Sequence, residues 1–205
     1  MKRWIFCLLL VATTLLLSSC IGIESDIRIR QDGSGVLTLS YTISQFIKNI
    51  DAGRSEKQLP LPVNEEEFRR SAERIEGLRL TDLEQREDEE NVYIQAELEF
   101  DSVEAVNALG RDGQLGISLE TQGGTTTFRQ LIYQGQQGEE ITEESLEMIE
   151  TFFDGYELVY SVTVPAEVRS NSLGVVAANG RTVTYTVTVP EILKTPEPIV
   201  LEVIW

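Results

Sequence analysis

The chain has 205 residues, of which 34 are acidic, 17 are basic and none is histidine, so its formal net charge at pH 7 is −17. This acidic balance argues against binding to nucleic acid or to anionic headgroups, because both need clustered lysine and arginine. The absence of histidine removes the commonest general base and the commonest zinc ligand.

The N-terminus has the pattern of a signal segment with a lipid-attachment site. Two basic residues precede an uncharged apolar stretch over residues 4–17, which is shorter than the roughly 20 residues of a membrane-spanning helix. The stretch ends in a lipobox, the site at which a diacylglyceryl group is joined to a cysteine, formed here by Leu17, Ser18, Ser19 and Cys20. We therefore predict that residues 1–19 are a cleaved lipoprotein signal peptide and that Cys20 carries the lipid. A plain transmembrane anchor, and a secretory signal cut at another bond, are the weaker interpretations.

Processing at Cys20 would shape the mature chain. Cys7 leaves with the signal, so Cys20 is the one cysteine that remains and no disulfide is expected. Stability must come from an apolar core, which a chain of this length can build as one domain or two small ones. The expected location is extracytoplasmic, on the cell membrane or the outer membrane, with the membrane as a partner through the N-terminal lipid. The residue after the cysteine is Ile21. In some diderm bacteria an aspartate at this position retains a lipoprotein at the inner membrane, so its absence favours the outer membrane.

Apolar periodicity predicts alternating strands and helices along the rest of the chain. A period of two, interrupted by turn residues, predicts three hairpins over residues 27–43, 78–100 and 115–133. Helical spacing of apolar residues predicts helices over residues 44–51, 64–76, 102–109 and 142–154. Further strands are predicted over residues 156–165, 168–177, 182–189 and 199–205. In the second hairpin, alternation is expected to place Leu78, Leu80, Asp82 and Glu84 on one side of the first strand.

The order of these elements predicts an α+β fold. Local hairpins imply antiparallel pairing, so we expect a curved, mainly antiparallel sheet with three or four short helices packed on one face. Residues 20–205 are expected to form a single extracytoplasmic domain. A division near residues 134–141 into two lobes is the alternative.

The chain offers few residues for catalysis or for cofactor binding. With Cys20 lipidated there is no thiol nucleophile, and no serine has a lysine three residues after it. No glycine-rich phosphate loop follows a predicted strand. The acidic runs lack the alternate spacing of a calcium loop. We expect no catalytic set, no metal and no cofactor, although a carboxylate pair brought together by the fold is left open.

The apolar residues of the predicted helices have two interpretations. The simpler one is ordinary packing against the sheet. The other is a groove for an acyl chain or a partner peptide, because concave apolar sites between helices and a sheet hold such ligands. The predicted groove is lined by Phe68, Ile75, Met148, Ile149 and Phe152, together with the extended segment 59–63.

Two segments resemble the LppM-like domain family of bacterial lipoproteins. One is the strand-Asp-Gly-x-Gly-strand unit over residues 27–39, directly behind the lipobox. The other runs from Val162-Thr163-Val164-Pro165 through Asn171 to the hairpin Asn179–Tyr185, in which Tyr185 stands where tryptophan is common in the family. The resemblance implies an extracytoplasmic, membrane-attached domain with a cavity between sheet and helices that can hold a lipid. It implies no catalytic residues.

These observations predict a membrane-anchored, non-enzymatic bacterial lipoprotein. Its expected role is to bind a lipid or another apolar ligand at the envelope surface. The alternative is a structural or assembly lipoprotein that docks an envelope protein partner, and an enzyme is a distant third.

Overall fold

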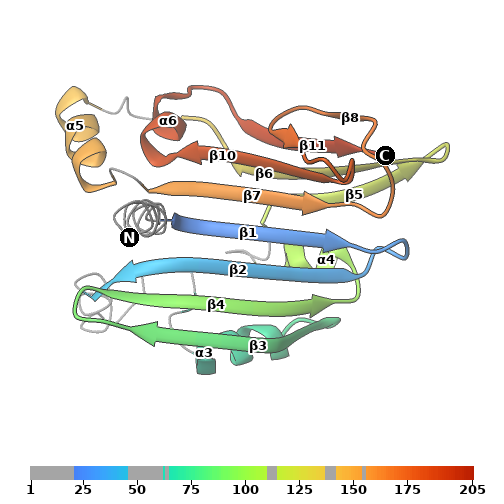
Figure 1. Cartoon of the computed structure of the whole chain (residues 1–205), viewed down its shortest axis with the longest axis horizontal. Helices are drawn as coiled ribbons and strands as arrows, with labels where there is room; N and C mark the ends of the chain where they lie inside the picture. The colour runs from blue at the N-terminus through green and yellow to red at the C-terminus, as the bar shows by residue number, and fades with distance from the viewer. Residues whose placement is uncertain (1–20, 46–61, 63–64, 110–114, 137–141, 154–155) are drawn as a thin grey trace, which may run out of the picture.

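The computed structural model describes residues 21–45, 62, 65–109, 115–136, 142–153 and 156–205 (Figure 1). The lipobox and nearly all of the helix expected over residues 44–51 lie outside the described residues, as does most of segment 59–63.

A seven-stranded sheet is the larger of the two sheets, with strand order β3-β4-β2-β1-β7-β10-β9. Its strands are β1 (Ile21–Ile29), β2 (Gly35–Ser44), β3 (Leu78–Glu87), β4 (Asn91–Phe100), β7 (Glu157–Thr163), β9 (Val175–Val176) and β10 (Thr182–Thr188). Neighbours pair antiparallel except β1 and β7, which are parallel. This parallel pair joins the N-terminal hairpins to the C-terminal strands.

A second sheet of four strands has the order β5-β6-β11-β8. It consists of β5 (Ile117–Gln122), β6 (Thr125–Tyr133), β8 (Ser170–Asn171) and β11 (Ile199–Ile204), all antiparallel. One sheet was expected from the sequence, so this second sheet is an addition to the predicted fold. All three predicted hairpins are confirmed, as β1-β2, β3-β4 and β5-β6.

The described part of the chain has four short helices, and the predicted α+β class is confirmed. They are α3 (Glu65–Glu73), α4 (Val103–Asn107), α5 (Glu143–Phe152) and α6 (Val189–Lys194). The first three fall inside predicted helices, and Ser102 caps α4 by accepting a hydrogen bond from the Ala105 N–H. Helix α6 was not predicted, although Thr188 and Glu191 form a capping box and Pro190 lies in its first turn.

One apolar cluster joins the two sheets to two of the helices, α3 and α4. It contains side chains from the large sheet, the small sheet, α3 and α4, and in Figure 1 α4 lies behind β1 and β2. Its largest fully buried members include Phe68, Phe100, Phe128, Ile27, Leu37, Leu98 and Leu201. The inward-facing residues of β4 are all buried, which confirms the alternation predicted for that strand: Val92, Ile94, Ala96, Leu98 and Phe100.

A β-bulge in β3 corrects the predicted alternation of that strand. The pairing with β4 shifts between Leu80 and Asp82, so one extra residue, Thr81, is inserted. Leu78 and Leu80 therefore face the core, whereas Asp82 pairs with Glu97 on the other face. The four residues expected on one side are divided between two faces, because the inserted residue moves the side chains that follow it to the opposite face of the sheet.

The segment predicted as one strand over residues 168–177 is also corrected. It forms two short strands in different sheets, with β8 pairing to β11 and β9 pairing to β10. Gly174 lies between them with φ +81°, and a Cβ there would lie 2.5 Å from the Thr184 carbonyl oxygen. The chain thus crosses from one layer to the other at a glycine that few other residues could replace.

A polar pocket on the open sheet face

One face of the large sheet packs on the core, and the other carries polar side chains. On β1, Ile27 and Ile29 are buried, whereas Glu24, Asp26 and Arg28 alternate with them on the opposite side. We call this second side the open face. Buried apolar and outward polar residues thus alternate along β1, as expected of an antiparallel sheet with one solvated face.

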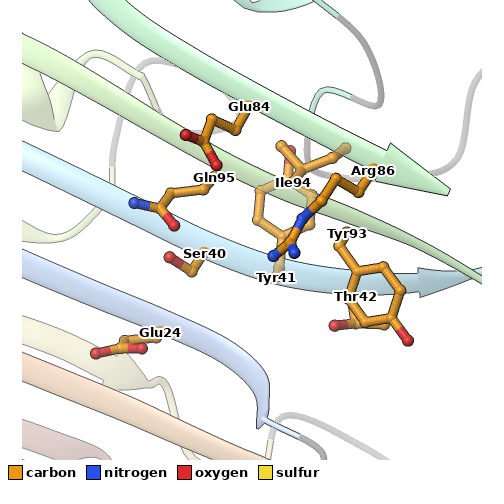
Figure 2. A pocket seen from close by; sticks show the side chains of 9 residues that line it. All are labelled: Glu24, Ser40, Tyr41, Thr42, Glu84, Arg86, Tyr93, Ile94 and Gln95. Atoms are coloured by element: carbon orange, nitrogen blue, oxygen red, sulfur yellow. The ribbon is translucent and has the colours of Figure 1, made fainter.

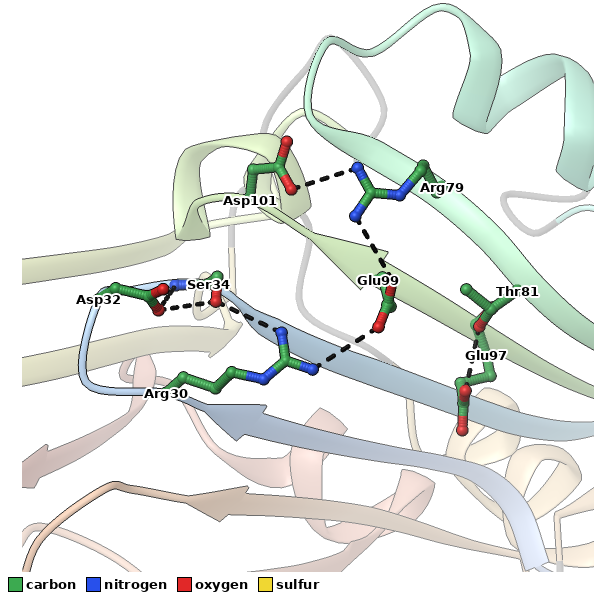
Figure 3. Close-up of polar contacts among 8 residues, drawn as sticks. All are labelled: Arg30, Asp32, Ser34, Arg79, Thr81, Glu97, Glu99 and Asp101. Carbon is green, nitrogen blue, oxygen red and sulfur yellow. Dashed lines mark hydrogen bonds and ion pairs between the residues drawn. The ribbon is translucent and has the colours of Figure 1, made fainter.

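At the end of the open face that carries the β1-β2 turn, charged side chains pair with one another (Figure 3). Arg30 lies 3.6 Å from Glu99, and Arg79 lies 3.4 Å from Glu99 and 3.3 Å from Asp101. The Ser34 N–H and hydroxyl donate to Asp32, which lowers the pKa of that carboxyl and orders the turn. These groups are exposed, so each ion pair contributes at most a fraction of a kcal/mol.

Toward the other end of the strands, the open face has a pocket of about 140 Å³ (Figure 2). Two rows of paired residues cross the strands here, and their members are Glu24, Ser40, Gln95 and Glu84 in one row and Thr42, Tyr93 and Arg86 in the other. Tyr41 and Ile94 also line the pocket, although their side chains are buried on the core side. Four strands therefore contribute to one hollow.

The polar groups of this pocket are available to a ligand. Among the described residues, Glu24, Glu84, Gln95 and Arg86 form no side-chain hydrogen bond or ion pair with another protein group. Tyr93 is positioned at the rim, where its hydroxyl donates to Asp88 at 3.0 Å and its ring remains 38% exposed. Two carboxylates, an amide and a guanidinium offer both donors and acceptors, so the pocket suits a polar partner.

The β3-β4 turn beside the pocket is strongly acidic and is held by its own backbone. The N–H groups of Glu90 and Asn91 donate to Asp88 at 2.9 and 2.7 Å, which lowers the pKa of that carboxyl. The ionised form of Asp88 therefore holds the turn and the Tyr93 hydroxyl together.

Tyr41 lies beneath the pocket and links β2 to the loop before α3. Its hydroxyl donates a hydrogen bond to the Pro62 carbonyl oxygen, and its ring centroid lies 6.3 Å from that of Phe68. Burial raises the pKa of Tyr41 above its usual value of 10.0. A neutral phenol is therefore part of the folded state.

We expect stability to fall in alkali because of this tyrosine. A phenol whose pKa is raised on folding contributes stability that is complete below about pH 10 and is lost as the pH rises toward the folded-state pKa. Tyr41→Phe should reduce this alkaline loss and cost about 1 kcal/mol at neutral pH, through the missing hydrogen bond. Tyr160 and Tyr185, whose pKa burial also raises, should retain the rest of the dependence. Urea unfolding across this pH range measures both effects, and an unchanged pH slope in Tyr41→Phe would contradict the assignment.

The described side chains of the predicted apolar groove, those of Phe68, Ile75 and Ile149, do not lie together in the structure. Phe68 is only 2% exposed, and its ring lies beside that of Tyr41. Ile75 packs on the apolar cluster that joins the two sheets. Ile149 is on α5, which contacts α6 and lies far from α3 at the other side of the large sheet (Figure 1). The side chains of Met148 and Phe152 are outside what the structure describes. Phe68 and Ile75 thus belong to the core, which is the simpler of the two interpretations.

The pocket residues were not singled out from the sequence. Most are ordinary positions of the predicted hairpins and Glu24 lies just before the first of them, so only the register of four strands gathers them. Within the described residues, no three acidic or cysteine side chains form a group that could hold a metal ion. No helix in that part of the chain is long and apolar enough to cross a bilayer.

Comparisons with known proteins give little more. No family model matches the chain, and no curated protein matches it. Among solved structures, the chain is similar to the folded domain of LppM from Mycobacterium tuberculosis, determined by NMR, with a TM-score of 0.45. The two share 11% identity over 90% of this chain and 88% of that one. The likeness is distant, and no functional argument follows from it.

Proposed function

We propose that this chain is a membrane-anchored, non-enzymatic envelope lipoprotein that is held by a lipid on Cys20. The observation that carries the proposal is the position of β1. It begins at Ile21, the residue after the lipobox cysteine, and it is a central strand between β2 and β7. The lipid would therefore be attached directly to the sheet without a linker, and the domain would lie against its membrane.

The pocket on the open face is the site proposed for a partner. Glu24 is four residues after Cys20, so at about 3.3 Å per strand residue the pocket would lie within roughly 15 Å of the bilayer. Its polar lining favours docking of an envelope partner over binding of an apolar ligand. Lipid binding stays a prediction, and native mass spectrometry of the intact lipoprotein would test it through any lipid bound in addition to the covalent one.

Replacement of Cys20 tests the anchor. In the full chain, Cys20→Ser should abolish incorporation of labelled palmitate and leave residues 1–19 uncleaved, since the thiol is the attachment atom. Cys7→Ser is the matched control and should be labelled and processed normally, because Cys7 lies in the segment that is removed. Label retained on Cys20→Ser would refute the proposal, as would a mature N-terminus at another residue.

A further inference from the structure

An aromatic pair lies at the end of the sheet where β1 begins. Phe153 follows α5 and Tyr156 precedes β7, with ring centroids 5.9 Å apart and an interplanar angle of 78°. The Tyr156 N–H donates a hydrogen bond to the Phe153 carbonyl oxygen at 3.1 Å, which holds the two residues together. Although it is a large apolar residue, Phe153 is 39% exposed.

The register of β1 and β7 places this pair beside the proposed anchor. The two strands are parallel, and Ile21 pairs with Glu157, the residue after Tyr156. Tyr156 also lies against Gly22, where a Cβ would be 3.0 Å from its ring. In Figure 1, α5 and the start of β7 lie at the same end of the sheet as the start of β1. The aromatic pair is therefore within a few residues of the atom that would carry the lipid.

We propose that Phe153 and Tyr156 insert into the interface of the bilayer that holds Cys20 and form a second, side-chain contact with the membrane. The inference rests on the proposed function, because the lipid on Cys20 is what brings this end of the sheet to the bilayer. Tyrosine favours the headgroup level because its ring is apolar and its hydroxyl can stay in water, and phenylalanine adds apolar surface to such an interfacial contact. A lipid anchor together with a second membrane signal holds a protein more firmly than either alone.

The charges at this end determine which lipids suit the contact. The acidic β3-β4 turn with Asp88, Glu89 and Glu90 is at the same end, because Ser44 pairs with Asn91 where β2 ends. On α5, Glu150 is already paired with Lys194 at 2.5 Å. The carboxylates of the acidic turn would repel anionic headgroups, and the charge of Lys194 is neutralised by Glu150, so the contact is apolar and suits a zwitterionic surface. We expect the domain to tilt so that α5 lies closer to the bilayer than the acidic turn does.

Fluorescence quenching tests the contact. The intact lipoprotein, with the lipid on Cys20 verified by mass, is reconstituted into phosphatidylcholine vesicles that contain brominated lipid. Phe153→Trp should lose emission by at least about twofold relative to vesicles without bromine, because its indole would lie at the headgroup level. The background is small, since Trp4 is removed with the signal and Trp205 pairs with Thr126 at the far end of the molecule.

Gln122→Trp is the matched control. Gln122 is exposed next to the β5-β6 turn, at the opposite end of the molecule from the start of β1 (Figure 1). It should show no quenching beyond that of the unsubstituted protein. Circular dichroism and the thermal midpoint of both variants establish that they fold.

The outcomes separate this inference from the proposed function. Folded, lipidated Phe153→Trp protein without quenching would overturn the inference and leave the anchor intact. Equal quenching of Phe153→Trp and Gln122→Trp would also overturn it, because the contact would not be specific to this end. Absence of the lipid mass on Cys20 would refute the proposed function before any fluorescence is recorded.

Discussion

Replacement of Phe128 by alanine is expected to lower the free energy of unfolding of the whole domain by about 3–5 kcal/mol, the cost of removing a buried aromatic ring and leaving a cavity. Phe128 is on β6 of the small sheet and has no exposed surface. It belongs to the same apolar cluster as Leu37 and Val162 of the large sheet. The loss should therefore weaken both sheets together.

Denaturant unfolding followed by tryptophan fluorescence and by circular dichroism measures this effect. Both probes should report one transition that shifts as a unit. Val175→Ala is the control and should change stability by less than about 0.5 kcal/mol, since Val175 is 74% exposed. Two transitions, of which Phe128→Ala shifts one alone, would favour the division into two lobes near residues 134–141.

Gly35→Ala is expected to destabilise the fold by about 3 kcal/mol, the upper end of the usual cost of overpacking. Gly35 is buried where β2 begins, and it pairs with Ile29 on one side and with Phe100 on the other. A Cβ there would overlap the carbonyl oxygen of Arg28 and lie 2.5 Å from the Phe100 Cζ atom. The first overlap is with backbone, so no change of side-chain rotamer relieves it.

Val36→Ala is the matched control for Gly35→Ala. Val36 is the next residue of β2, half-exposed on the open face, and its truncation should cost less than about 1 kcal/mol. Urea midpoints of the two variants give the comparison. If Gly35→Ala were as mild as Val36→Ala, the close packing of Phe100 on this strand would be refuted.

Local chemistry accounts for what could be predicted from the sequence. The three hairpins follow from alternating apolar residues on each side of a turn, such as the one in which Asp32 binds Ser34 and Gly33 adopts φ +84°. In the same way Asn179 accepts hydrogen bonds from Arg181 and Thr182 at the turn before β10. Each of these turns depends on residues within a few positions of one another, so the sequence of the turn is enough to predict it.

Long-range pairing accounts for what could not be predicted. The bulge at Thr81 depends on the register of β3 against β4, and segment 168–177 divides between two sheets because β8 pairs with β11 and β9 pairs with β10. Phe68 has two interpretations in the sequence, core packing or a groove, and it lies in the core because α3 packs on β3 at the edge of the large sheet. The pairing of Asn171 with Val203 and the contact of Phe68 with Tyr41 join residues that are far apart in the sequence.

The sequence by itself determined the acidic composition, the hairpins and the α+β class, since each follows from composition or from short-range spacing, and the lipobox stays a prediction from the same spacing. Only the tertiary structure decided that β1 is a central strand paired with β7, that a second sheet covers part of the core face, and that Glu24, Glu84, Arg86 and Gln95 share one pocket. The physical reason is that strand order and register arise from contacts between segments far apart in the chain. A shift of one residue in any of these pairings would send the same side chains to the opposite face.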